Sequence, residues 1–456
     1  MASDYRLISP STGHVLYLVN SSGTPTAGGS PFAAATTPFG IVSDWAPTAA
    51  PPVAQYAGGP PLTNGGSLAY LSNDNVEEAL TLTYQGGSGD DARRAVQLVR
   101  QQITTLFAGP CLLYARPSGA SEPTYFELLT ADVQEIGWPD TKTSPGEGAT
   151  SLHLTLSIVR RPYGGAAALD SLLSASSFTN NASATALTPI RGDLAYEGQP
   201  LNIMIAKPTS QAAAQVYLAT VYSVTQKTVS STLTAQTSTT GVTFTASSSI
   251  DLSALRTRAG LKLRCTARLA TLTNPSKAQV RAVVQTTAGN TLWTGPWVTL
   301  STNTTAQLVD CLGSGLDSLR VPISNTSSVL VQIGLRSIDG TAITATLDYV
   351  EAILYYDWCV VEAASGLGSS QRYQLLGAQN LSGGGWLPLT PPAALVTDGS
   401  DTPVKAAVIK GQLVRAFSGC SLYVAWKESD GGHTKTDTAA VSVSHCALYR
   451  SLRGVG

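Results

Sequence analysis

The feature of the sequence that most limits the fold is a succession of strand-like runs between residues 191 and 362 with no helical run among them. Runs such as 215–224 (QVYLATVYSV) and 261–271 (LKLRCTARLAT) have the residue content of strands, and in the second run apolar and polar residues alternate. Closely spaced strands without intervening helices are typical of antiparallel sandwiches and barrels. The sequence therefore predicts a mostly β chain in which residues 191–365 form a β-sandwich or barrel.

The first 165 residues predict a β domain that contains one helix. Alternating runs at 75–84 and 151–162 are typical of strands. Between them an apolar stripe recurs at helical spacing and predicts a helix over about 89–107. The stripe consists of Ala92, Val96, Val99, Ile103 and Leu106. Acidic residues in the first turn and a Gly-Pro pair after the last turn are the usual signals of helix ends.

Residues 21–64 form a neutral segment with eight prolines and a single charged residue, Asp44. This composition predicts a long extended arm. Its aromatic residues argue against a free linker, and the candidates for inter-subunit contact are Phe32, Phe39, Trp45 and Tyr56. Two interpretations are open: the arm lies on a neighbouring subunit, or it packs on its own domain.

Two further boundaries follow from composition. Residues 166–190 are rich in Ala and Ser, with Asp170 as their only charge, and predict a linker. Residues 366–456 begin with the flexible run SGLGSS and continue with strand-like runs and turns, which predicts a small C-terminal β domain. This domain either stands alone or completes the first domain after an insertion.

Charge in this chain is scarce and balanced: 28 Lys and Arg stand against 29 Asp and Glu, and charged residues make up only 12%. Binding nucleic acid without sequence preference needs excess positive charge, so this class of function is excluded. No apolar stretch of about 18 residues is present, which argues against a membrane span. The N-terminal MASDYRLISP lacks the apolar region of a secretory signal, so we expect assembly in a host cytoplasm.

The sequence carries no recognisable catalytic or phosphate-binding motif. Glu77 and Glu78 are neighbours on a predicted strand and point apart, so they do not form a catalytic carboxylate pair. The four histidines and six cysteines show no zinc-ligand spacing. We therefore expect no enzymatic activity, no cofactor and no metal, with the cysteines as buried thiols. A bridge between Cys420 and Cys446 is left open.

Aromatic residues gather in the predicted middle domain, where a flat ring facing outward can stack on the C–H face of a sugar. The candidate glycan contacts are Trp293, Trp297, Tyr349 and Tyr356. Tyr355 and Trp358 belong to the same group. Because successive strand residues point to opposite faces, some of these rings face outward in either register. The alternative is that they pack in the core or in a protein interface.

Two parts of the chain resemble known families. Residues 1–165 resemble the N-terminal domain of tailed-phage tail proteins of the distal-tail (Dit-like) type, through the opening strand, the arm, the helix DDARRAVQLVRQQI and the closing run LTLSIVRRPYG. Residues 316–356 resemble the closing strands of a jelly-roll carbohydrate-binding module, with Asp348 before the last apolar run. The resemblance implies a jelly-roll fold for 191–365 and a sixfold ring that joins the tail tube to the tail tip.

The sequence and the resemblance together give the hypothesis of a structural phage-tail protein located in the virion. Its partners would be further copies of itself, in a hexameric ring, and other tail proteins such as the tube, the tail tip or the baseplate hub. The sandwich would project outward and contact host-surface glycans. The alternative, from another functional class, is a carbohydrate-binding adhesin or receptor-binding tail protein whose sugar contacts are primary.

Overall fold

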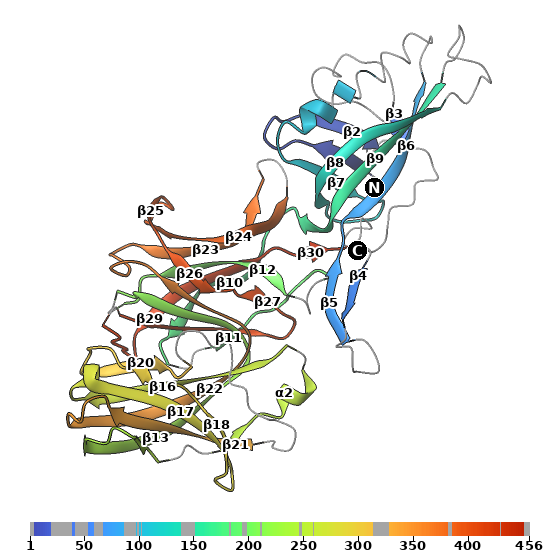
Figure 1. The fold of residues 1–456 in the computed structure, drawn as a ribbon. Coiled ribbons are helices and arrows are strands. Elements are labelled where there is room, and N and C mark those ends of the chain that lie inside the picture. The colour runs from blue at the N-terminus through green and yellow to red at the C-terminus, as the bar shows by residue number, and fades with distance from the viewer. Residues whose placement is uncertain are drawn as a thin grey trace.

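The computed structural model shows an elongated, almost entirely β molecule, with one sheet at the N-terminal end and stacked sheets at the other (Figure 1). The prediction of a mostly β chain is confirmed. Short helical segments are α2 (Ala254–Thr257) and η2 (Pro275–Lys277). The structure describes residues 4–19, 39–41, 53–58, 67–85, 97, 100–101, 103–137, 151–181, 184–193, 198–209, 212–245, 249–258, 260–312, 328–381, 385–428 and 430–450.

Eight of the described strands form the N-terminal sheet, in the order β2-β1-β7-β8-β9-β6-β3, with β30 paired to β9. Their bounds are β1 Asp4–Ile8, β2 Val15–Val19, β3 Phe39–Ile41, β6 Val76–Gln85, β7 Cys111–Arg116, β8 Thr124–Gly137, β9 Ser151–Ala166 and β30 Leu448–Tyr449. Within the predicted helix 89–107, the structure assigns helix at residues 97, 100, 101 and 103–106. Ile103 and Leu106 of its apolar stripe are buried, as an amphipathic helix requires.

The predicted arm contains strands. Phe39 begins β3, which pairs with β6 opposite Tyr84, so this part of the arm joins the sheet of its own chain. Tyr56 lies in β4 (Val53–Gly58), which pairs with β5 (Ser67–Asn73) as a separate two-stranded ribbon. Phe32 and Trp45 lie outside the described residues.

Two seven-stranded groups of the described strands pack face to face as the middle sandwich. The cover sheet has the order β10-β29-β12-β23-β24-β25, with β27 on β12, and the shared sheet has the order β11-β28-β13-β22-β16-β20, with β26 on β22. The cover-sheet bounds are β10 Asp170–Thr179, β12 Gln199–Ala206, β23 Arg372–Asn380, β24 Trp386–Thr397, β25 Pro403–Ala406, β27 Arg415–Ala416 and β29 Thr438–His445. The shared-sheet bounds are β11 Ala184–Ala186, β13 Gln215–Gln236, β16 Lys262–Leu272, β20 Ala306–Asp310, β22 Ile343–Glu362, β26 Val408–Gly411 and β28 Ser421–Lys427.

The shared sheet also carries a second sandwich. Six described strands form the distal sheet, in the order β14-β21-β17-β18, with β15 on β21 and β19 on β17. Their bounds are β14 Val242–Thr243, β15 Ile250–Asp251, β17 Ala278–Thr286, β18 Thr291–Thr294, β19 Val298–Thr299 and β21 Ser328–Ser337. Strands β13 and β22 pair along their whole lengths, from Gln215↔Glu362 to Gln236↔Ile343. Val361 of β22 therefore lies in the middle core while Val350 of the same strand lies in the distal core.

Three of the predicted boundaries are wrong. Residues 366–456 form no separate domain among the residues described, because β29 pairs with both β10 and β12 of the cover sheet. The predicted linker 166–190 contains β10 and β11, which are strands of the middle sandwich. The predicted single domain 191–365 is divided between two sandwiches. The physical reason is that most of the distal sandwich is inserted in the chain between β13 and β22, which pair with each other. The alternation of apolar and polar residues along one strand does not reveal which other strand it pairs with.

Smaller predictions about single residues are confirmed. All six cysteines are free and buried, so Cys420 and Cys446 form no bridge. Glu78 is buried while Glu77 on the same strand is exposed, so the two carboxylates do point apart. In the part of the chain that the structure describes, no helix is long and apolar enough to cross a membrane.

Candidate ligand pocket

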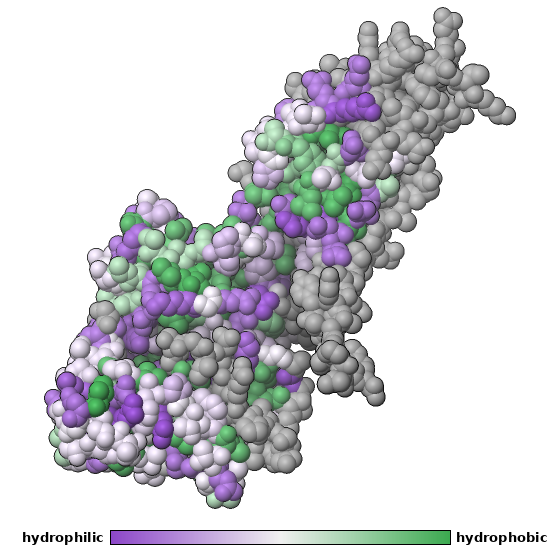
Figure 2. All heavy atoms as spheres, in the orientation of Figure 1, coloured by the Kyte–Doolittle hydropathy of each residue, from purple (hydrophilic) through white to green (hydrophobic). Residues whose placement is uncertain are grey.

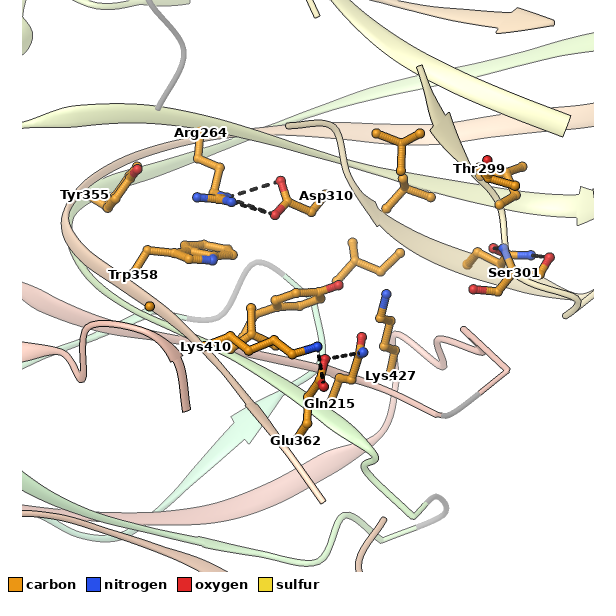
Figure 3. Close-up of a pocket in the computed structure, with 18 of the residues that line it drawn as sticks. Gln215, Arg264, Thr299, Ser301, Asp310, Tyr355, Trp358, Glu362, Lys410 and Lys427 are labelled. Atoms are coloured by element: carbon orange, nitrogen blue, oxygen red, sulfur yellow. Dashed lines mark hydrogen bonds and ion pairs between the residues drawn. The ribbon is translucent and has the colours of Figure 1, made fainter. Parts of the chain in front are cut away.

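A cavity of about 630 Å³ opens on the face of the shared sheet that points away from both cores (Figure 3). Strand alternation assigns the faces. In β13, Val216 and Leu218 enter the middle core, so Tyr217 between them points to the opposite side. Strands β16 and β20, whose apolar residues enter the distal core, contribute lining residues. So do β13, β26, β28 and the Tyr355–Glu362 stretch of β22, which belong to the middle sandwich. The pocket therefore lies at the joint between the two sandwiches.

The inner wall of the pocket is aromatic. Tyr217 and Tyr355 have ring centroids 5.7 Å and 6.0 Å from that of Trp358. Tyr355 and Trp358 are three residues apart, a spacing that puts side chains on opposite faces of a regular strand. Val221 pairs with Tyr355 and Thr220 with Asp357, so Tyr356 is the extra residue of a β-bulge. The bulge turns both rings to the same face.

A desolvated ion pair forms one side of the pocket. The Arg264 guanidinium donates from Nε and Nη2 to Asp310 Oδ2 at 3.0 Å and 2.8 Å. The two side chains are only 8% and 14% exposed, and the guanidinium lies 4.5 Å from the ring centroid of Trp358. Such a two-pronged, charge-assisted contact fixes both side chains. The arrangement is consequently formed in the chain before any ligand arrives.

The opposite side of the pocket carries a second network. Glu362 accepts hydrogen bonds from Gln215 Nε2 at 2.5 Å and pairs with Lys410 Nζ at 2.6 Å. The nearby Lys427 ammonium lies 5.4 Å from the ring centroid of Tyr217 and makes no ion pair with a described carboxylate. Burial lowers the pKa of Lys427, and the nearby carboxylates of Asp310 and Glu362 offset only part of this effect. Figure 3 shows Lys427 and Glu362 below the Arg264–Asp310 pair.

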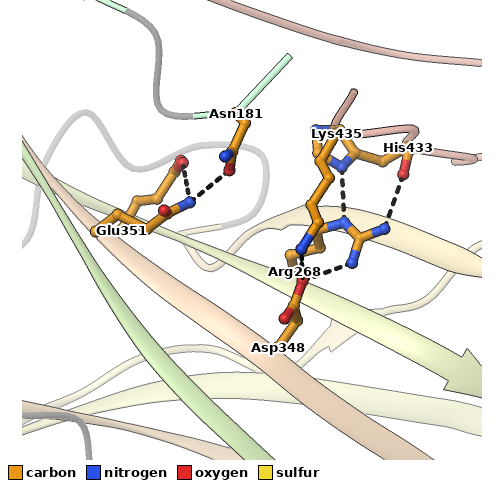
Figure 4. Close-up of polar contacts among 7 residues, drawn as sticks. Asn181, Arg268, Asp348, Glu351, His433 and Lys435 are labelled. Atoms are coloured by element: carbon orange, nitrogen blue, oxygen red, sulfur yellow. Dashed lines mark hydrogen bonds and ion pairs between the residues drawn. The ribbon is translucent and has the colours of Figure 1, made fainter. Parts of the chain in front are cut away.

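A buried polar cluster lies near the pocket and holds the two sandwiches together (Figure 4). Arg268 pairs with Asp348 at 2.7 Å and donates from Nε to His433 Nδ1 at 3.2 Å. Burial and the Arg268 charge lower the pKa of His433 to about 3, so its imidazole is neutral and accepts this bond. Lys435 adds a 3.3 Å contact to Asp348. We name residues 428 and 430–437 the clamp segment, because they follow β28 of the middle sandwich and bind the distal one.

The structure scatters the predicted glycan contacts instead of bringing them together. Tyr349 is only 3% exposed, so the prediction is wrong for this residue. Tyr356 stacks on Phe417 with ring centroids 4.7 Å apart and packs against the middle core. Trp293 packs against the distal core, while Trp297 lies under the guanidinium groups of two arginines. None of the four lines the pocket.

The pocket residues that sequence reasoning missed are Gln215, Tyr217, Arg264, Asp310, Glu362 and Lys427. A signal for one of them was present: Arg264 stands in the apolar strand LKLRCTARL, where a charge needs a partner. Among the described residues, no group of three or more His, Cys, Asp or Glu side chains is placed to hold a metal ion. The absence of catalysis stays a prediction.

No protein-family model matches the chain, and no curated protein matches it. Among solved structures it is similar to the Dit protein of phage SPP1, with 11% identity and a TM-score of 0.27 over 76% of this chain and 98% of that one. A chain of the phage p2 baseplate in its activated conformation gives 10% identity and a TM-score of 0.25, over 78% and 98% of the two chains. A chain of infectious bursal disease virus gives 10% and 0.21, over 63% and 79%. TM-scores this low establish neither a shared fold nor a shared function.

Proposed function

We propose that this chain is a non-enzymatic structural component of a phage tail, of the distal-tail or baseplate type. In this proposal the N-terminal sheet builds a homo-oligomeric ring, most simply a hexamer, inside the virion. The sandwiches project from the ring, and other tail proteins bind to it. Assembly takes place in the host cytoplasm. The resemblance of residues 1–165 to distal-tail proteins supports the proposal, and so do one feature of the fold and the low charge content of the chain.

The β4–β5 ribbon is the observation that carries the proposal. Its two strands pair with each other and with no other described strand, and they extend away from the N-terminal sheet (Figure 1). An isolated two-stranded ribbon is marginally stable in water. It gains stability when it lies against a further surface, and a neighbouring copy of the chain would provide one.

The composition of the chain supports the same assignment. Figure 2 shows hydrophobic atoms where β7 and β8 lie in Figure 1, but the large apolar side chains of β7, Leu112 and Leu113, are buried in the core. The low charge content of the whole chain fits extensive interfaces, whose centres are depleted of charged residues.

The test is the mass of the particles that the purified chain forms. We expect mass photometry and negative-stain imaging to show a ring near six times 47.2 kDa. Replacing residues 53–73, the β4–β5 ribbon, with a short Gly-Ser linker should leave folded monomers. Shortening the distal hairpin turn at 288–290 is the matched control and should leave the rings intact. Rings that persist without the ribbon, or a chain that stays monomeric with purified neighbouring tail proteins, would overturn the proposal.

A second candidate function is glycan contact by the projecting distal sandwich, in the manner of a receptor-binding protein. The observation that favours it is Trp297, a half-buried ring on the distal sheet with Arg281 and Arg336 at 4.4 Å and 4.6 Å from its centroid. Aromatic rings beside guanidinium donors suit polyhydroxylated ligands. A glycan array should lose signal with the Trp297→Ala variant, and an unchanged array would reject this surface.

A further inference from the structure

We infer that the pocket at the joint of the two sandwiches binds an acidic sugar, a ligand that combines one carboxylate with several hydroxyl groups. The inference takes its ligand class from the second candidate function above, but it places the ligand on a different surface from Trp297. Its support comes from the size of the cavity, its uncompensated charges and the donors and acceptors on its walls.

The size and the wall composition of the cavity fit a small polar ligand. A volume of about 630 Å³ lies within the range of about 300–1,000 Å³ found for small-molecule pockets. Tyr217, Tyr355 and Trp358 provide apolar surface on one wall. Thr299, Ser301 and the amides of other lining residues provide polar groups on the other. A ligand with both C–H faces and hydroxyl groups matches such walls.

The lining of the pocket holds four cationic side chains and three carboxylates, an excess of one positive charge that a single negative charge on a ligand would balance. Its three carboxylates all have cationic partners: Arg264 holds Asp310, Lys410 holds Glu362, and Arg415 holds Asp357. Lys262 and Lys427 also line the pocket, and neither makes an ion pair with a described carboxylate. Lys427 is the more enclosed of the two. The charges of Asp310 and Glu362 act on its ammonium group without a direct contact and offset only part of the cost of its burial. A carboxylate on the ligand would add a direct counterion.

An unused donor lies in the same wall. Trp358 Nε1 is shielded from solvent and has no hydrogen-bond acceptor among the described residues. A buried N–H group without an acceptor costs free energy, and native structures rarely leave one unpaired. In Figure 3 the indole of Trp358 lies between Arg264 and Lys410. A hydroxyl or carboxylate oxygen of the ligand would accept this bond once the indole turns, because the nitrogen is closed to solvent in the present arrangement.

Ligands of neighbouring chemistry fit less well. A neutral sugar leaves Lys427 without a direct counterion. A small anion such as acetate has no hydroxyl groups to bond with the polar side chains of the walls or with the carboxylate oxygens of Asp310 and Glu362. A strongly acidic peptide meets those two carboxylates and is repelled by them, because like charges in a partly enclosed site raise the free energy of the complex. The interleaving of both charge signs therefore selects a ligand with one charge and several hydroxyls.

The experiment is calorimetric titration of the full chain with three acidic sugars: glucuronate, galacturonate and N-acetylneuraminate. The matched controls are glucose and galactose, which lack the carboxylate, and sodium acetate, which lacks the hydroxyl groups. We expect at least one acidic sugar to bind at least tenfold more tightly than its neutral counterpart and than acetate, because a charge-assisted hydrogen bond is about twice as strong as a neutral one. Binding of none of the acidic sugars, or equal binding of acetate, would overturn the inference.

Single-residue variants test whether the ligand binds in this pocket. Lys427→Met keeps the aliphatic stem and removes the charge, and we expect it to weaken acidic-sugar binding at least tenfold while the chain stays folded. Trp358→Phe keeps an aromatic ring and removes the N–H group, and it should weaken binding several-fold. The matched control Trp297→Ala should leave this binding unchanged. Binding lost with Trp297→Ala and retained with Lys427→Met would refute the pocket and leave the second candidate function standing. The ring assay is independent of all three results.

Discussion

The buried ion pair of the N-terminal sheet gives the sharpest test of what stabilises the proposed ring-forming unit. Arg160 of β9 donates from Nε to Glu78 Oε1 of β6 at 2.7 Å, and the two side chains are 0% and 2% exposed. The guanidinium also lies 4.5 Å from the ring centroid of Phe126. Arg160→Met preserves the stem on that ring but leaves the Glu78 carboxylate buried without its arginine.

Removing one partner of a buried pair typically costs about 3–5 kcal/mol, because the remaining charge loses its compensation. The exposed fractions near zero leave no solvent screening to reduce this value. Since about 1.4 kcal/mol corresponds to a factor of ten, the sheet should open about 10² to 10⁴ times more often. Replacing both partners, as Arg160→Met with Glu78→Leu, should recover most of the loss, since apolar residues of similar volume substitute well for buried pairs.

Native-state hydrogen exchange, read on peptides from β6 and β9, measures this opening directly. The neighbouring pair Arg161–Glu127 is the control: its atoms lie 3.1 Å apart, but its side chains are 52% and 42% exposed. Arg161→Met should therefore cost less than about 1 kcal/mol. Equal effects of Arg160→Met and Arg161→Met, or a double variant as unstable as the single one, would refute the reasoning.

Two further predictions concern the sandwiches. Arg268→Met removes the contacts to Asp348 and His433, so limited proteolysis should cut the clamp segment faster. The hydrogen-exchange protection of both sandwich cores should stay the same. Unchanged cleavage would show that these contacts do not hold the clamp segment. Burial raises the pKa values of Cys265 and Cys446 from 9.0 to about 12. The thiols of the unfolded chain ionise at lower pH than those of the folded chain, so the free energy of unfolding should fall as the pH rises from about 9 toward 12. A thiol reagent at pH 8 should also label the native chain far more slowly than the urea-unfolded chain.

Local sequence patterns were sufficient for the elements of this fold but insufficient for their pairing. Alternation in TAAVSVSH, which forms β29, predicts a strand, and Ala439, Val441 and Val443 on one of its faces are indeed buried. The same alternation does not reveal that this strand pairs with β10 and β12, more than 200 residues earlier. Pairing over such distances is decided by which apolar faces meet, and an inserted sandwich separates the partners along the chain.

The candidate site could be predicted only in part, for a local reason. Strict alternation places Tyr355 and Trp358 on opposite faces, and it gives no preference to Trp358 over Trp297. The bulge at Tyr356 reverses this assignment, and no glycine or proline next to it signals an extra residue. Asp310 and Lys427 are joined to the site only by folding, since they lie on β20 and β28, which three strands separate in the order of the shared sheet.

The bulge also explains why the pocket lies at the joint. At Tyr356, β22 passes from the distal core, which contains Leu354, to the middle core, which contains Cys359. The extra residue lets both stretches keep their apolar side chains inside while the opposite face gathers aromatic rings. A ligand in the pocket therefore touches both sandwiches at once, through β16 and β20 on one side and β13 and β28 on the other. Because its contacts come from both bodies, the bound ligand is expected to stiffen the joint, in the same direction as the clamp segment, and to fix the direction in which the distal sandwich projects.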